Sequence, residues 1–168
     1  MSNYKKLFNL IKQECANFKP KKKIALHEPT FGPDEIFAFT KQMITTKVTM
    51  GEKVRKFEND FCKKFDFKNG VTSNSGSSAN LLMIAALCSK LKKRHLKPGD
   101  EVIVPALTWS TSIFPLTQYG LVPVLVDSDV ETLNVNIKSI ENSITAKTKA
   151  ILAVHIYGNP CDMDAIEK

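Results

Sequence analysis

Long apolar runs are missing from this 168-residue sequence. None of its apolar stretches approaches the roughly 18 residues that a membrane-spanning helix needs. The amino-terminal stretch MSNYKKLFNLIKQECANFKPKKK is rich in lysine and has no apolar segment of the kind found in secretory signals. We therefore expect a cytoplasmic protein that makes no contact with a membrane.

Cysteine is scarce, and its four copies are scattered. Cys15, Cys62, Cys88 and Cys161 lie far apart and form no CxxC pair. This spacing favours reduced thiols over a disulfide framework or a metal site, so we expect no bound metal. Cys88 stands among apolar residues, which is typical of a core position.

Net positive charge is almost absent from most of the chain, although the formal net charge of the whole sequence is +7. The first 23 residues hold seven lysines and one acid, whereas the rest holds 17 basic and 16 acidic residues. We interpret residues 1–23 as a basic N-terminal extension, either a solvated helix and linker or a contact for an acidic ligand or subunit. No aromatic residues are interleaved with the lysines in the pattern of a stacking platform, so we expect no nucleic-acid partner.

The composition that is present, 43% hydrophobic and 24% charged, is typical of a soluble globular domain. Helical spacing predicts one helix over residues 3–18 and another that begins at Pro33. The stretch TMGE predicts a capping box in which Thr49 is the cap. The helix that follows is expected to bury one apolar stripe, formed by Val54, Phe57, Phe61 and Phe65.

From Gly70 onward, short β-type runs alternate with helical ones. This alternation predicts an α/β fold with a mainly parallel sheet flanked by helices on both faces. The chain stops inside its last expected helix, so we expect a truncated N-terminal piece of a longer protein, or a chain whose remainder is supplied elsewhere. The expected strands are residues 71–73, 101–105, 121–127 and 149–158, and the expected helices are residues 79–91, 109–119, 137–144 and 162–168.

The stretch SNSGSS stands where a strand should end and a helix should begin. The free N–H groups and the dipole at a helix N-terminus bind anions, and Gly76 would let a phosphate approach the backbone. Ligands of open α/β sheets bind at this edge of the sheet. The stretch therefore predicts either a phosphate seat or a serine-capped helix with no ligand. It is neither a Walker A motif nor a GxGxxG motif, so nucleotide hydrolysis is poorly supported.

Trp109 is the only tryptophan, and it follows the next expected strand. An exposed indole there would offer a flat face to an aromatic ring, whereas the alternative is a core tryptophan. His155 stands at another strand end, where a structural hydrogen bond is at least as good an interpretation as a ligand contact. Asp127 and Asp129 are interpreted as turn residues and Asp162 as a helix cap.

Several segments in series resemble one family: FGPDEI, VTMGEKVRKFENDF, NSGSSANLLMIAAL, LKPGDEVIVPALTWSTS, YGLVPVLVDSDVETLNVN and SITAKTKAILAVHIYGNPCDMDAI. Together they resemble the N-terminal half of the DegT/DnrJ/StrS family of pyridoxal-phosphate enzymes, the sugar aminotransferases and deoxysugar 3-dehydratases. The resemblance runs from about Ile24 to Lys168. It assigns residues 24–168 to the N-terminal part of an incomplete PLP-binding large domain.

The resemblance implies the aspartate-aminotransferase type I fold, a homodimer of full-length chains, and a nucleotide-linked keto-sugar as substrate. It implies that Gly76, Ser77 and Ser78 seat the phosphate of pyridoxal 5'-phosphate (PLP) and that Trp109 stacks on the pyridine ring. The Schiff-base lysine, or the histidine that replaces it in dehydratases, is expected beyond Lys168. No catalytic residue is therefore assigned within this chain.

Three functions stay open at this point. The first, which we favour because it is the commoner activity, is an aminotransferase acting on a nucleotide-linked keto-sugar in surface-polysaccharide or deoxyaminosugar biosynthesis. The second is a nucleotide-sugar 3-dehydratase. The segments SGSSANLLMIAAL and WSTSIFPLTQYGL resemble the dehydratases that serve lipopolysaccharide sugars, whereas VHIYGNPCDMDAI resembles the aminotransferases. The third is a non-catalytic domain or an inert fragment that binds a phosphate or nothing, since we expect the 168 residues alone to be inactive.

Overall fold

The computed structural model describes residues 2–18 and 30–168, which fall into two compact units. Unit 1 is Met1–Val71 and unit 2 is Thr72–Lys168. The boundary expected between residues 23 and 24 lies outside the described residues. No helix in the described part of the chain is both long enough and apolar enough to cross a membrane.

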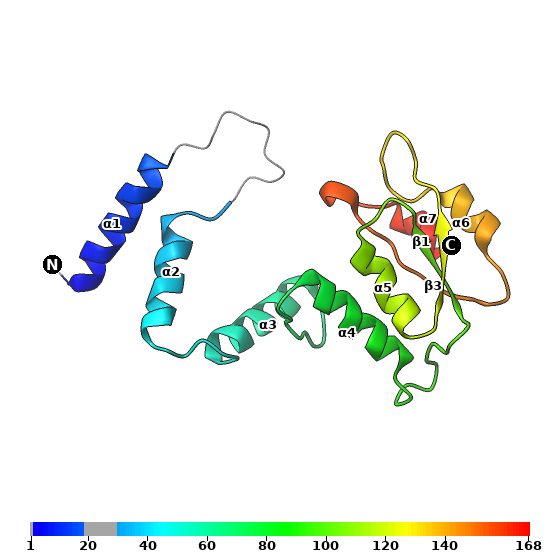
Figure 1. Ribbon diagram of the computed structural model, residues 1–168, viewed down its shortest axis with the longest axis horizontal. Coiled ribbons are helices and arrows are strands. Elements are labelled where there is room, and N and C mark those ends of the chain that lie inside the picture. The colour runs from blue at the N-terminus through cyan, green and yellow to red at the C-terminus, as the bar shows by residue number, and fades with distance from the viewer. Residues whose placement is uncertain (1, 19–29) are drawn as a thin grey trace. The chain divides into compact units, whose positions relative to one another are not determined.

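Unit 1 contains three helices, α1 (Asn3–Asn17), α2 (Pro33–Ile44) and α3 (Glu52–Phe65) (Figure 1). Helix α2 begins at Pro33 as expected, because a proline at the first position loses no hydrogen bond that the helix would make. The carboxylate of Glu35 accepts the backbone N–H of Gly32 at 2.7 Å and so closes the first turn. The pattern of proline and acid near the start therefore predicted this helix correctly.

Aromatic side chains join α1 to α2. The ring of Phe37 meets the edges of the Tyr4 and Phe8 rings, with centroid distances of 6.4 and 5.1 Å. The ammonium group of Lys41 lies 5.5 Å from the centroid of the Tyr4 ring, within the range of a cation–π contact. Residues 3–17 of the expected basic extension thus form a helix that packs against α2 through aromatic contacts.

Two expectations about α3 are wrong. The helix begins at Glu52 after Gly51, and Thr49 makes no cap, because the chain turns into the helix two residues later than the TMGE pattern predicts. Its phenylalanines are also not buried: Phe57, Phe61 and Phe65 are 57%, 43% and 53% exposed. Their rings pack against one another instead of into a core, with centroids 5.9 and 4.6 Å apart along the helix.

Unit 2 is an α/β unit built on a three-stranded sheet. The strand order is β2-β1-β3, and β1 pairs with both neighbours in parallel, as the strand–helix alternation predicts. Its elements, visible in Figure 1, are α4 (Gly76–Cys88), β1 (Glu101–Pro105), α5 (Ser110–Gln118), β2 (Val122–Val126), α6 (Ile137–Ser143), β3 (Thr148–Ile151), the 3-10 turn η1 (Ile156–Gly158) and α7 (Met163–Glu167).

Side chains of β1 alternate between two cores, one on each face of the sheet. Val102 and Val104 pack with Ile84 of α4 and Leu116 of α5. Ile103 points the other way and packs in the second cluster, with Val126, Val135, Ile140 and Cys161. Because neighbouring residues of a strand face opposite sides, the unbroken VIV run needs cover on both faces, which α4 and α5 provide on one side and α6 on the other.

The strand expected at residues 71–73 does not form. Val71 is 80% exposed, unlike the buried apolar residues of β1. Strand β3 is also shorter than expected, since it ends at Ile151 instead of running to Gly158. The N–H of Leu152 still donates to the carbonyl of Ile103 at 2.8 Å, and after it the chain leaves the sheet for η1.

Asn134 holds the turn that follows β3. This side chain is only 5% exposed, and its Nδ2 donates to the carbonyls of Asn159 and Pro160 at 3.1 and 3.0 Å. Its Oδ1 accepts the N–H of Ile156 at 3.2 Å. One buried amide thus satisfies three backbone groups of a segment that has left the sheet.

We expect Asn134→Ala to lower the free energy of unfolding by about 1–3 kcal/mol, because it removes the partner of three part-buried backbone groups. Urea unfolding followed by circular dichroism measures this change. Asn142→Ala is the matched control, since Asn142 is exposed on α6. Equal losses in the two variants would contradict the role given to Asn134.

Candidate phosphate and aromatic site

The carboxyl ends of the parallel strands define the edge of unit 2 at which the candidate residues lie. The chain leaves β1 at Pro105 and enters α5 at Ser110, and it leaves β3 at Ile151 and enters η1 (Figure 1). Open parallel sheets bind ligands at this edge, because loops and helix N-termini gather there. The candidate site therefore combines the segments that follow β1 and β3 with the first turn of α4.

The first turn of α4 leaves two backbone donors open. The hydroxyl oxygen of Ser75 caps the helix by accepting the N–H of Ser78 at 3.2 Å, and the Ser75 carbonyl accepts the N–H of Ala79 at 3.0 Å. In the described part of the chain no acceptor faces the N–H groups of Gly76 and Ser77. Both residues are exposed, so these two donors point to solvent with the positive end of the helix dipole behind them.

The three residues expected to seat the phosphate thus differ in whether their backbone N–H groups are free. Gly76 and Ser77 offer free amides, whereas the amide of Ser78 already bonds to the Ser75 hydroxyl and its own hydroxyl lies 3.2 Å from that of Ser75. A Cβ atom added to Gly76 would meet no heavy atom within 4 Å, so the space in front of this backbone is open. The arrangement fits a phosphate approached by the amides of Gly76 and Ser77.

Trp109 lies at the N-cap position of α5, and its side chain is 75% exposed. The alternative of a core tryptophan is therefore excluded for this unit. Its backbone carbonyl accepts the N–H of Ser112 at 2.9 Å, and the hydroxyl of Thr108 donates to the buried hydroxyl of Ser112 at 3.0 Å. These bonds fix the backbone from which the indole extends.

One hydrogen bond joins the two helix starts. The side-chain Nδ2 of Asn80, in the second turn of α4, donates to the carbonyl of Thr111 in the first turn of α5 at 3.3 Å. Gly76 lies one turn before Asn80, and Trp109 lies two residues before Thr111. The N-terminus that can hold an anion and the exposed indole therefore belong to two tethered helices that start at the same edge.

His155 makes the structural hydrogen bond that the sequence left open. Its Nδ1 accepts the backbone N–H of Cys161 at 3.0 Å. Nδ1 is therefore the ring nitrogen without a hydrogen, and Nε2 carries it in the neutral ring. The residue is exposed, so a role in ligand contact stays compatible with this bond.

Asp129 is a turn residue and Asp162 a cap residue, as expected. A side-chain oxygen of Asp129 accepts the N–H groups of Glu131 and Thr132 and the Thr132 hydroxyl. These bonds, above all that from the Thr132 amide, lower the pKa of Asp129. The carboxylate of Asp162 caps α7 by accepting the N–H of Ala165 at 3.0 Å. Neither carboxylate is paired with a second one for acid–base chemistry.

Cys88 lies at the C-terminal end of α4, a full helix away from its first turn. Burial, and secondarily the charge of Asp100, raises the pKa of the Cys88 thiol, so this thiol stays protonated and inert at neutral pH. No group of three or more His, Cys, Asp or Glu side chains among the described residues could hold a metal ion.

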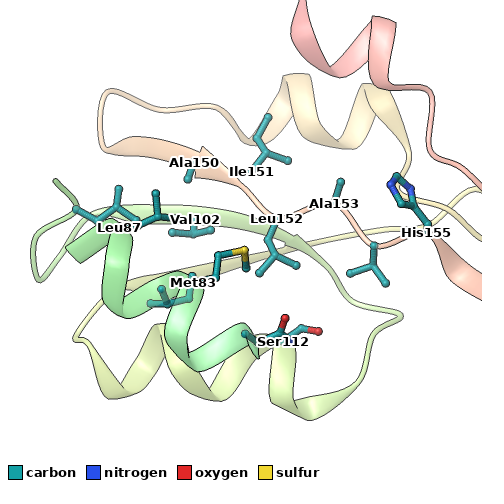
Figure 2. Close-up of a pocket in the computed structure, with 13 residues that line it drawn as sticks. Met83, Leu87, Val102, Ser112, Ala150, Ile151, Leu152, Ala153 and His155 are labelled. Carbon is teal, nitrogen blue, oxygen red and sulfur yellow. The ribbon is translucent and has the colours of Figure 1, made fainter. Parts of the chain in front are cut away.

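A cavity of about 440 Å³ lies between α4 and the chain that continues from β3 (Figure 2). Met83 and Leu87 of α4 line one side and Leu152 the other, while Ser112 and His155 contribute polar atoms to its wall. Most of this wall is apolar and none of it carries a charged lysine or arginine. This apolar wall does not suit an anion, whereas the exposed first turn of α4 offers free backbone donors.

The sequence predicted a serine-capped helix as one alternative without saying which serine caps it, and the structure gives Ser75 as the cap of α4. Asn80, which ties α4 to α5, was missed, since its partner Thr111 is 31 residues away and no local pattern links them. The helix itself starts at Gly76, three residues earlier than expected.

The chain matches the DegT/DnrJ/EryC1/StrS aminotransferase family over residues 29–168. It is 50% identical over 143 residues to GDP-4-keto-6-deoxy-D-mannose 3-dehydratase of Yersinia pseudotuberculosis, covering 85% of this chain and 36% of that protein. The chain thus spans about a third of the length of this relative.

Two kinds of solved structure resemble it. One is an E. coli GDP-4-keto-6-deoxy-D-mannose-3-dehydratase with bound hydrated PLP, at 46% identity and a TM-score of 0.80 over 86% of this chain and 37% of that one. The other is the PLP form of a Streptococcus pneumoniae protein of the sugar aminotransferase class, at 30% identity and a TM-score of 0.73 over 86% and 35%. The expected PLP-dependent transferase fold is therefore confirmed, and the chain belongs to the DegT/DnrJ/EryC1/StrS aminotransferase family.

Proposed function

We propose that this chain is part of a PLP-dependent 3-dehydratase acting on a nucleotide-linked 4-keto-6-deoxy sugar. The observation that carries the proposal is its identity of 50% and 46% to two such dehydratases, against 30% to the sugar aminotransferase. The activity favoured on sequence alone, an aminotransferase, thus becomes the second candidate. The coarser expectation, a PLP-family protein related to enzymes of nucleotide-linked sugars, is retained.

In this proposal the first turn of α4 binds the cofactor phosphate. The free amides of Gly76 and Ser77, the Ser77 hydroxyl and the helix dipole supply donors and positive potential for a doubly charged group. Ser78 contributes indirectly, because its amide holds the Ser75 cap that shapes the turn. The exposed indole of Trp109 supplies a flat surface for the pyridine ring.

Bound at this edge, the cofactor supplies an electron sink that makes loss of a hydroxyl beside a ketone feasible. The described residues bind and orient it, whereas none of them is assigned to move a proton. We propose that residues 24–168 form the N-terminal part of a PLP-binding domain and that the lysine or histidine that acts on the substrate follows Lys168. A homodimer of full-length chains, in the cytoplasm, stays a prediction.

The second candidate, an aminotransferase, is supported by the similarity of the chain to a solved structure of the sugar aminotransferase class. The aminotransferase-class structure aligns over the same 86% of the chain with a TM-score of 0.73, so the described fold is compatible with either reaction. The phosphate seat and the aromatic platform serve both, because they contact the cofactor and not the reacting carbon of the sugar. The distinction therefore rests on residues outside this chain and must be made by experiment.

The product distinguishes the two reactions directly. We incubate the full-length protein, which continues beyond Lys168, with PLP, glutamate and GDP-4-keto-6-deoxymannose. It should yield a 3-deoxy sugar that mass spectrometry detects. The chain ending at Lys168 should give no turnover and serves as the control. An amino sugar as the sole product would support the aminotransferase, and an unchanged substrate with PLP bound would contradict both.

Borohydride reduction tests the residue that faces the cofactor. The full-length protein with PLP should show an absorbance band at the border between the ultraviolet and the visible. After treatment with borohydride and dialysis no covalent adduct of PLP with the protein should remain, because a histidine replaces the lysine in our proposal. Peptide mass spectrometry detects any adduct. A stable lysine adduct would overturn the dehydratase assignment in favour of the aminotransferase, and a missing band would contradict PLP binding itself.

Ser77→Trp should weaken PLP binding at least about tenfold, which corresponds to about 1.4 kcal/mol, because the indole fills the space in front of the free amides. Titration of the apo full-length protein with PLP, followed by absorbance, measures the affinity. Asn142→Trp adds the same side chain at an exposed position of α6 and should leave the affinity unchanged. Wild-type affinity in the Ser77 variant would count against the seat.

A further inference from the structure

Tyr157 is held in a strained backbone conformation and pointed at solvent. Its φ and ψ are 53° and 23°, in the left-handed region that bulky residues rarely adopt, and its side chain is 94% exposed. Such a conformation costs on the order of 1–3 kcal/mol and persists only where surrounding structure enforces it. The exposed ring gains no burial in unit 2 that would offset this cost.

The enforcement comes from inside the unit. The three bonds of Asn134 fix Ile156 on one side of Tyr157 and Asn159 and Pro160 on the other. The side-chain Nδ2 of Asn159 also donates to the carbonyl of Thr132 at 3.2 Å. Because these bonds hold the backbone on both sides of Tyr157, we expect the residue to keep its left-handed conformation.

The backbone does not require a tyrosine at this position. Gly158, the next residue, has a φ of +83°, and a glycine at position 157 would adopt the left-handed conformation without steric cost. A large aromatic residue is therefore the less favourable choice for the turn itself. This makes its exposed side chain, and not the backbone, the feature that needs an explanation.

The position of Tyr157 matches that of Trp109. Ile103 of β1 and Ile151 of β3 are paired in the sheet, and Trp109 and Tyr157 each lie six residues further along the chain. Both side chains are exposed, and both follow the carboxyl ends of adjacent parallel strands. Two aromatic residues are thus presented at the edge where ligands of parallel sheets bind.

We propose that Tyr157 is a substrate-contact residue for the nucleoside-diphosphate-linked sugar. Its ring offers a face to the sugar or the base, and its hydroxyl offers one donor and one acceptor for hydrogen bonds. The proposal rests on the proposed function, with Trp109 serving the cofactor and Tyr157 the substrate. Asn134 is then a positioning residue, because it holds the turn from which the ring extends.

The test compares Tyr157→Gly with Tyr157→Phe in the full-length protein. Tyr157→Gly should raise the KM for GDP-4-keto-6-deoxymannose about five- to tenfold, as expected for loss of an aromatic contact, while PLP content by absorbance stays at the wild-type level. Tyr157→Phe should keep most of this affinity if the ring face makes the contact. Inhibition by GDP separates the two moieties: a weaker GDP inhibition constant in the variants places the ring at the nucleotide, and an unchanged one places it at the sugar.

Strain relief provides the matched control. Thr46 in unit 1 is also left-handed, with a φ of 59°, so Thr46→Gly relieves a similar backbone cost and should leave KM unchanged. Tyr157→Gly should leave the melting temperature equal or higher. A wild-type KM in an active Tyr157→Gly variant, or a lowered melting temperature with dissociation of an oligomer, would overturn the contact with substrate. Lack of activity in the wild-type protein would instead be a failure of the proposed function.

Discussion

Parallel pairing of β1 on both of its sides is the constraint on which the rest of unit 2 depends. Because β1 is central, its alternating side chains must be covered on both faces, which requires α4 and α5 on one face and α6 on the other. Each crossover returns the chain to the same end of the sheet. The starts of helices and the ends of strands therefore meet at one edge, and polar and aromatic residues that would be scattered in the sequence become neighbours there.

Local signals predicted the elements whose causes are local. Pro33 starts α2, and Asp162 caps α7. The misses concern long-range partners. The α3 stripe has the period of a buried face, but its phenylalanines stay exposed, and residues 71–73 have the composition of a strand but form none. The period of the apolar residues shows which face of a segment could be buried, but it does not show whether another part of the protein covers that face.

The candidate site divides in the same way. Gly76, Ser77 and Trp109 could be proposed from sequence because a glycine among hydroxyls before a helix, and a tryptophan after a strand, have direct physical meanings. The residues that arrange them could not. Asn80 reaches Thr111 and Asn134 reaches Asn159 across long stretches of chain, so only the folded structure reveals these bonds. Short polar side chains with distant backbone partners leave no periodic trace in a sequence.

These two asparagines hold two different parts of the same edge. The Asn80 bond joins the first turns of α4 and α5, so the proposed phosphate seat and the backbone at Trp109 are tied together. The Asn134 bonds hold the turn that carries the exposed side chain of Tyr157. In the proposed function the first arrangement serves a cofactor that stays bound through many cycles, and the second presents a side chain to a substrate that enters and leaves. The placement of strain at Tyr157, and not at Gly76 or Trp109, is consistent with that division.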